Sequence, residues 1–424
     1  MKIAMLADLH LNKSAHKEVL DKSSEFRKVP FRHADFMRAF MWSIDKILNL
    51  NPDLVVINGD IYDHPDPSNK VRGFFSGQLR RLLEKNIRTL ILIGNHDVSQ
   101  ETHSLADIQE LKLGKLIVIS NPTTTVFKND NDEKVQLVLL PYSVDVEQKK
   151  TTIKESFYKL VEDQKNEKPY PRLFCGHFAV KGQKMNSYEV EEGGALLSHA
   201  EETKTKDFLN NSKKDISSSD LDKIDADYIF LGDFHEMQRL KCKTKGWYGG
   251  SLEKNNFNER SQQKGFLFYD SSYDDEKMGN CRFIKNPYCR PMLQLEGTLT
   301  DMKKQFASID VTEWQNAIVR LKFIGTKKEM IDFSTGESSF KNEVVEKLNA
   351  IHMYHDIGKV LDEDAEMIMS RIEKEIDEHG VMEETDVMDV VEEIIDEREK
   401  DEKEKEILME MATDVYKKTM GKRK

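Results

Sequence analysis

The chain has 424 residues, of which 38% are hydrophobic and 33% charged, a composition typical of folded proteins with two or three domains. No apolar run approaches the roughly 18 residues that a membrane-spanning helix needs, so we expect no membrane contact. The first apolar run ends at Asp8, which excludes a signal peptide, and four cysteines without a CxxC pair favour reduced thiols in a cytoplasm.

The net charge of −12 is unevenly distributed along the chain. Between Leu361 and Glu410 there are 22 acidic residues against 6 basic ones, a net charge of −16. The rest of the chain therefore carries a charge of +4. Charge does not exclude a polyanionic substrate, because the acidity belongs to one C-terminal segment.

Five short apolar runs in the front part of the chain each end in polar residues of the types that bind metals. Such runs, bounded by glycine, predict strands that are buried on both faces. Segments of helical character, including 33–50 and 71–85, separate the first three runs. Alternating strands and helices predict a layered α/β domain with its ligands at the strand ends. The runs are 3–7, 54–58, 89–93, 173–175 and 228–231.

The second half of the chain predicts two further modules. A strand at 263–270 and a polar linker at 270–280 end the first domain. A strand, helix, strand, helix and strand then predict a small second α/β domain, and the acidic segment predicts two amphipathic helices on either side of Gly380. The five elements are expected at 292–296, 299–308, 316–324, 339–349 and 351–360. The predicted domains are 1–275, 276–360 and 361–424.

The polar residues after the apolar runs form a set of ligands suited to a divalent metal. Carboxylates, imidazoles and one amide favour Mn²⁺, Fe or Zn²⁺ over Ca²⁺, and the set lacks the thiolates of a structural zinc site. Two ions roughly 3.5–4 Å apart would need a bridging carboxylate and would clamp a phosphoryl group. The residues are Asp8, His10, Asp60, Asn95, His177 and His235.

The order of these motifs resembles the calcineurin-like metallophosphoesterase superfamily. The motifs are Asp8-x-His10, Gly59-Asp60, Gly94-Asn-His-Asp97, Gly176-His177 and Gly232-Asp-Phe-His235. Two further stretches, Gly59 to Ser68 and Tyr248 to Glu253 followed by Lys264-Gly-Phe266, are similar to SbcD-type DNA repair nucleases. The size and the acidic tail most resemble the phage-encoded recombination endonuclease subunit of that family.

The resemblance implies a four-layer sandwich, two mixed sheets flanked by helices, with a small α/β capping domain and a C-terminal helical module. It also implies two divalent ions, Mn²⁺ or alternatively Mg²⁺. By position, one ion would be held by Asp8, His10, Asp60 and His235. The other would be held by Asp60, Asn95, His177 and Asp233. His96 would be the general acid, with Asp97 orienting it.

Asp233 departs from the family pattern, which usually has Gly-His-x-His at this motif. Here Gly232 is followed by Asp233, Phe234 and His235. The carboxylate can still bind a metal as a hard anionic donor. Alternatively it supports the site from outside the ligand set or caps a helix, and the second ion is then bound loosely.

Several basic residues follow the ligand motifs in the sequence. Side chains of this kind contact phosphate oxygens without reading sequence, although solvated loop charges are an equally good interpretation. Two histidines beside the second and third motifs are further candidates for DNA contact. The candidates are Lys13, His64, Lys70, Arg72, His103, Lys181 and Lys184.

The resemblance implies a 3′-to-5′ exonuclease and single-strand endonuclease for DNA, active in recombination, repair or replication. An ABC-type coiled-coil ATPase resembling SbcC would bind the acidic module 361–424, and the chain would form a homodimer within a heterotetramer. The cytoplasm is the expected location, that of the host if a phage encodes the chain. A phosphoesterase for small substrates and a weakly catalytic DNA-binding scaffold are the alternatives.

Overall fold

The computed structural model describes residues 1–13, 20–21, 26–164, 169–181, 183, 216–325, 333 and 339–360. The predicted acidic module 361–424 and Lys184 lie outside these residues. The described residues up to Arg290 form one compact unit, and those from Pro291 onward form a second.

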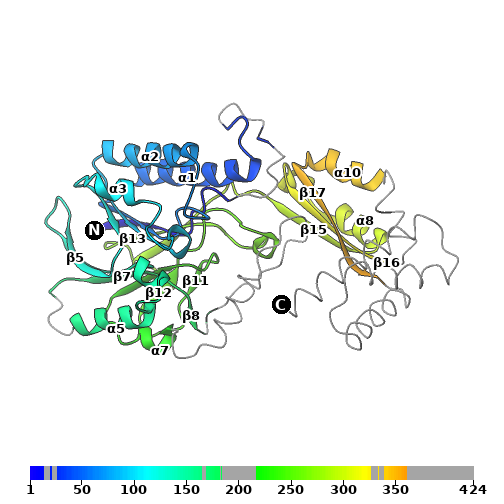
Figure 1. The fold of residues 1–424 in the computed structure, drawn as a ribbon. Coiled ribbons are helices and arrows are strands. Elements are labelled where there is room, and N and C mark those ends of the chain that lie inside the picture. The colour runs from blue at the N-terminus through cyan, green and yellow to red at the C-terminus, as the bar shows by residue number, and fades with distance from the viewer. Residues whose placement is uncertain are drawn as a thin grey trace, which may run out of the picture. The chain divides into compact units, whose positions relative to one another are not determined.

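The first unit contains a six-stranded sheet whose central strands are parallel. β1 to β4 run in one direction. At the other edge β13 runs antiparallel to β1, and β14 in turn runs antiparallel to β13. The helices α1 (Phe31–Leu50) and α2 (Asn69–Glu84) cover its outer face (Figure 1). The strand order is β14 (Cys281–Lys285), β13 (Gly265–Asp270), β1 (Lys2–Leu6), β2 (Leu54–Asn58), β3 (Arg88–Leu92) and β4 (Leu116–Ile119).

A second six-stranded sheet packs against the inner face of the first. Four of its strands are parallel, and the short β11 and the edge strand β5 are antiparallel. The helices α5 (Ile153–Asp163) and α7 (Ser218–Leu221) cover its outer face (Figure 1). The order is β11 (Gln238–Arg239), β12 (Lys245–Tyr248), β10 (Tyr228–Gly232), β7 (Arg172–His177), β6 (Lys134–Leu140) and β5 (Thr123–Lys128).

Three hydrophobic cores hold these four layers together. Because side chains alternate along a strand, Ile3 and Met5 of β1 face the second sheet, whereas Ala4 and Leu6 face the helices. The remaining elements of this unit are short. They are η1 (Asn95–Asp97), α3 (Ala106–Glu110), α4 (Val144–Glu147), β8 (Val180–Lys181), β9 (Ile216–Ser217) and η2 (Phe257–Glu259).

The second unit has the predicted order of strand, helix, strand, helix and strand. Its three strands are parallel, with β16 in the middle, and its helices share one apolar core with the sheet. The elements are β15 (Met292–Gly297), α8 (Leu299–Ser308), η3 (Val311–Trp314), β16 (Ile318–Gly325), α10 (Ser339–Leu348) and β17 (His352–Val360).

The boundary between the units differs from the predicted one at 275/276. β14 pairs with β13 in the first sheet, and Cys281 is buried in the core between the two sheets. The units divide between Arg290 and Pro291 instead. Among the described helices, none combines the length and the apolarity that crossing a membrane requires.

Candidate metal centre

Five parallel strands bring their carboxyl ends to one edge of the first unit. β1, β2 and β3 of one sheet lead into Asp8, Asp60 and Asn95, while β7 and β10 of the other lead to His177 and Asp233. Asp8, His10 and Asp60 have φ values of 52°, 43° and 51°. This left-handed backbone is uncommon outside glycine and indicates that packing holds these residues in place.

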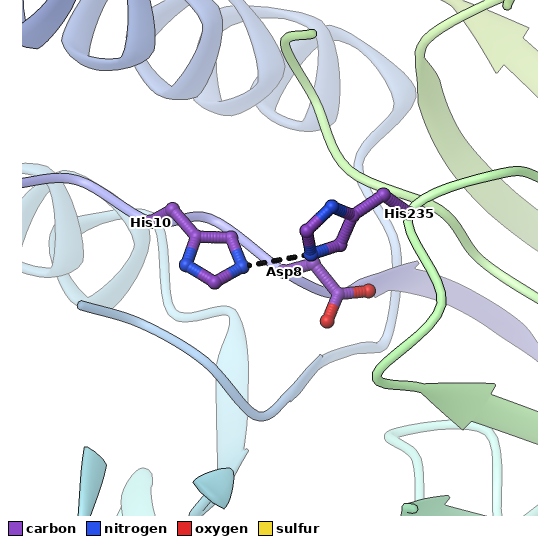
Figure 2. Close-up of side chains that lie close together, drawn as sticks. All are labelled: Asp8, His10 and His235. Atoms are coloured by element: carbon purple, nitrogen blue, oxygen red, sulfur yellow. Dashed lines mark hydrogen bonds between the residues drawn. The ribbon is translucent and has the colours of Figure 1, made fainter. Parts of the chain in front are cut away.

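The first group of ligand-type side chains consists of Asp8, His10 and His235. Figure 2 shows the two imidazole rings beside the carboxylate, with a dashed line joining one nitrogen of each ring. Nε2 of His10 lies 3.1 Å from Nε2 of His235. Asp8 and His10 are buried, and His235 comes from the loop between β10 and β11.

The contacts of this group suit a cation. Nδ1 of His235 lies 2.9 Å from Oε1 of Glu259 and 3.0 Å from the side-chain amide of Asn255. Because a carboxylate only accepts, whereas an amide can turn its oxygen toward the ring, the ring hydrogen belongs on Nδ1. Nε2 of His235 then offers a lone pair toward His10. Asp8 Oδ2 is buried and has no hydrogen-bond partner among the described residues. A buried carboxylate oxygen without a partner is costly, and a metal ion would remove that cost.

The second group contains Asp60, Asn95 and His177. Nε2 of His177 lies 3.2 Å from Asp60 Oδ1 and 3.0 Å from Asn95 Oδ1. Nδ1 of His177 donates to the carbonyl oxygen of Asn58 at 2.7 Å, so Nε2 is the ring nitrogen that faces the two oxygens. Asp60 Oδ2 lies 3.7 Å from His10 Nε2. Asp60 therefore stands between the two groups, where a bridging ligand would be.

Glycine at positions 59 and 94 permits this close packing. Gly59 has a φ of 82°, and a Cβ there would lie 2.1 Å from Nδ1 of His177. A Cβ on Gly94 would lie 2.2 Å from Asp60 Oδ1. The two positions thus have no room for a side chain beside the ligands.

The charges in the site act strongly on one another. Burial raises the pKa of Asp8 to about 7. Burial would also raise the pKa of Asp60, but His177 and the other histidines outweigh it and hold that pKa well below its usual range. For His177, burial favours the neutral form, yet the Asp60 carboxylate raises the pKa well above its usual value. Such mutual shifts are typical of functional sites.

Asp233 lies at the edge of the second group. Its Oδ1 is 4.0 Å from Nε2 of His177, and its backbone N–H donates to Asp8 Oδ1 at 2.9 Å. Burial raises the pKa of its carboxyl group. The backbone of Asp233 thus supports Asp8, whereas metal ligation by its side chain stays a prediction.

His96 lies next to both groups, and about a third of its side chain, 35%, is exposed. Its Nδ1 donates to the carbonyl oxygen of Asp63 at 2.7 Å, and its backbone N–H donates to Asp60 Oδ1 at 3.0 Å. Nε2 lies 4.0 Å from Asp60 Oδ2. Burial would lower the pKa of His96, but Asp60 and Asp63 outweigh burial and raise it. The ring can therefore carry a proton on the nitrogen that faces the site.

Comparison with known proteins identifies the family. A model of the calcineurin-like phosphoesterase family matches residues 1–237, more than half of the chain. The chain belongs to this family. The two-metal chemistry typical of the family agrees with the His and Asp groups described above.

Three relatives of this phosphoesterase have names that refer to DNA repair or to a nuclease. A DNA double-strand break repair protein Mre11 of Methanococcus maripaludis is 26% identical over 66% of this chain and 73% of its own. The SbcD component of the nuclease SbcCD of Staphylococcus epidermidis is 23% identical over 71% of this chain and 74% of its own. An Mre11 of Methanosarcina acetivorans is 22% identical over 79% of this chain but 47% of its own. These are cellular proteins and lend no support to a phage origin.

Asp97 serves the phosphoesterase site differently from the prediction. Its buried carboxylate accepts hydrogen bonds from the backbone N–H groups of Ile61, Tyr62 and Gly94 at 3.0–3.2 Å. Burial raises its pKa to about 6. Asp97 thus joins the ends of β2 and β3, and the carbonyl of Asp63, instead of Asp97, orients the His96 ring.

Two carboxylates beside the ligand histidines were not predicted. Asp63 Oδ1 lies 3.2 Å from His10 Nδ1 and 3.1 Å from the Lys13 ammonium. Glu259 contacts His235, as described above. The signal for Asp63 was its place three residues after Asp60 in the second motif. Glu259 falls between two recognised stretches, and no spacing rule pointed to it.

The candidate DNA contacts fall into three kinds. Lys13 lies at the site because it pairs with Asp63. Arg72 donates to the carbonyl of Ser104 at 2.7 Å, and His103 is buried with Nε2 2.8 Å from Gln109 Oε1. Both therefore make contacts inside the protein, and a DNA contact by either side chain stays a prediction. The side chains of His64, Lys70 and Lys181 are exposed.

Proposed function

We propose that the chain is a metal-dependent DNA nuclease, a 3′-to-5′ exonuclease and single-strand endonuclease. The observation that carries the proposal is the convergence of ligand-type side chains from five strand ends around the single carboxylate of Asp60. The names of the relatives, Mre11 and the nuclease SbcCD, supply the substrate class. Phosphodiester hydrolysis between two ions is the chemistry that such a set of ligands supports.

The proposed ligand sets share Asp60. Mn²⁺ is the preferred ion, with Mg²⁺ as the alternative, because oxygen donors are mixed with imidazole. One ion would be held by Asp8, His10, Asp60 and His235. The other would be held by Asp60, Asn95, His177 and Asp233. Ions bound there would polarise the phosphoryl oxygen and lower the pKa of water.

A residue of the protein itself would protonate the leaving group. The backbone carbonyl of Asp63 holds the His96 ring through Nδ1, which leaves Nε2 to present a proton. Asp60 and Asp63 raise the pKa of His96, which favours the protonated ring that a general acid needs. The proton would pass from Nε2 to the oxygen that leaves the phosphorus, so that the leaving strand departs as an alcohol.

An ABC-type ATPase resembling SbcC is the proposed partner, in a heterotetramer with two copies of this chain. The name of the staphylococcal relative, which marks it as one component of the nuclease SbcCD, supports this proposal. The acidic segment 361–424, which lies outside the described residues, is the proposed binding segment for the ATPase.

The proposal is tested by incubating end-labelled single- and double-stranded DNA with the purified chain and Mn²⁺. We expect His96→Asn to lower the cleavage rate by about 10²–10⁴-fold, the contribution of a general acid, while Mn²⁺ binding is retained. Asp233→Ala should lower both cleavage and the affinity for one ion. His352→Asn on β17 of the second unit is the matched control and should cleave as the wild type does.

A different result would favour another function. DNA left intact by the wild type, even with its ATPase partner and ATP, contradicts the nuclease. Tight DNA binding without cleavage would then identify a scaffold, and hydrolysis of bis-p-nitrophenyl phosphate alone would identify a phosphoesterase for small substrates.

A further inference from the structure

His235 differs from the other ligand-type histidines in how it is held. His177 ends strand β7 and donates to a carbonyl of β2, so the two sheets themselves fix its ring. His235 lies in the loop after β10, and its side chain is 19% exposed. A loop residue needs another support if its ring is to stay directed at Asp8 and His10.

Glu259 and Lys264 supply a buried support on the far side of the His235 ring. Oε1 of Glu259 accepts from Nδ1 of His235 at 2.9 Å. Oε2 of Glu259 accepts from the Lys264 ammonium at 2.6 Å and from the backbone N–H of Asn255 at 2.9 Å. Both Glu259 and Lys264 are buried, with 2% and 1% exposure.

Lys264 also contacts the backbone of the same histidine. Its ammonium donates to the backbone carbonyl of His235 at 2.8 Å, to Ser251 Oγ at 2.9 Å and to Gln262 Oε1 at 2.8 Å. Lys264 thus holds the backbone of His235 directly and the imidazole through Glu259. Burying an ammonium is costly unless it is paired and hydrogen-bonded, and here the carboxylate of Glu259 supplies the pairing charge.

We propose that Glu259, held by Lys264, is the positioning residue for His235. The carboxylate keeps the ring hydrogen on Nδ1, and thereby the lone pair of Nε2 stays directed at Asp8 and His10. A carboxylate behind a metal-binding histidine orients the ring and increases its basicity. The inference rests on the proposed metal centre and adds the residues that decide how well one of its two ions is bound.

The test is a calorimetric titration of the metal-free full-length chain with Mn²⁺. The double variant Glu259→Leu/Lys264→Met removes the pair without leaving one buried charge alone. We expect one of the two ions to bind about 10–100-fold more weakly, the usual effect of losing such a support, and the other ion to bind as before. Glu259→Gln, which is nearly isosteric, should weaken the same ion by less.

A cycle with His235→Ala distinguishes positioning from a general structural role. If Glu259 acts through His235, the double variant should weaken Mn²⁺ binding no further once His235 is replaced. Asp35→Asn is the matched control, because Asp35 is a buried carboxylate paired with Arg32 at 2.8 Å. It should lower the thermal midpoint without changing Mn²⁺ affinity. Nitrogen NMR of the metal-free chain should show the Nδ1–H form of His235 in the wild type and a mixture of forms in Glu259→Gln.

The outcomes separate this inference from the proposed function. Wild-type affinity for both ions in Glu259→Gln and in the double variant would overturn it, as would an equal loss in the His235→Ala background. A wild-type chain that binds no Mn²⁺ would instead overturn the metal centre itself. Loss of DNA cleavage with unchanged metal binding would also count against positioning.

Discussion

At the scale of single residues, three histidines of the site are oriented in the same way. In each of three rings, Nδ1 faces a fixed oxygen: Asn58 O for His177, Asp63 O for His96 and Glu259 Oε1 for His235. Because the hydrogen is held on Nδ1, Nε2 is left to face the centre. The sequence pattern records the histidines but not these partners, two of which are backbone carbonyls.

The affinity for Mn²⁺ should fall as the pH is lowered, because Asp8 then takes up a proton. Burial raises the pKa of Asp8 to about 7 in the metal-free protein, and only the deprotonated carboxylate is a ligand. Above this pKa a proton does not compete with the ion, and below it the affinity should fall by about tenfold per pH unit. Titrations between about pH 8 and pH 6 measure this dependence.

Asp8→Asn is the control for the pH dependence. The amide cannot take up a proton in this range, so the variant should bind more weakly at high pH and lose less of its affinity as the pH falls. Equal affinity of the wild type at both ends of the range would contradict the assignment of Asp8.

At the scale of elements, the strands carry the site and the helices stabilise the strands. The predicted runs became β1, β2, β3, β7 and β10, and the predicted helices became α1 and α2. β6 and α5 were not predicted, although both contribute to the core of the second sheet. Their sequences carry no ligand motif, and a short apolar run such as 135–140 is ambiguous when read alone.

Phe40 on α1 tests how far the helices contribute to stability. It is fully buried and its ring centroid lies 5.6 Å from that of Phe75 on α2. Phe40→Ala should lower the free energy of unfolding by about 3–5 kcal/mol, because it leaves a cavity between both helices and the sheet. Urea unfolding of the metal-free protein measures the change. Leu111→Ala, at a site that is 65% exposed, should cost less than about 0.5 kcal/mol; similar losses in both variants would contradict this account.

At the scale of the whole molecule, the predicted metal ligands all belong to the first unit. The chain divides between Arg290 and Pro291, and β14 and Arg290 itself complete the first unit. Arg290 Nε donates to the buried carboxylate of Asp35 at 3.0 Å, which ties this end of the unit to α1. The centre should therefore form without the second unit.

Two fragments test this division. The fragment 1–290 should fold and bind Mn²⁺ with the affinity of the full chain. The fragment 1–275 should be much less stable, because it lacks β14 and exposes the core between the sheets to water. Circular dichroism and Mn²⁺ titration of both fragments decide the matter. Equal stability of the two would place the boundary at the earlier position after all.

The strands, their polar ends and the family could be predicted from the amino-acid sequence, because apolar runs and ligand types are local properties that spacing preserves. The α/β order of the second unit could be predicted for the same reason. Other roles became visible in the folded chain alone: Asp97 joins two strand ends, Asp63 orients His96, and Glu259 and Lys264 stand behind His235. These roles depend on which groups meet across loops and sheets, and the direction of a hydrogen bond leaves no periodic mark on the chain.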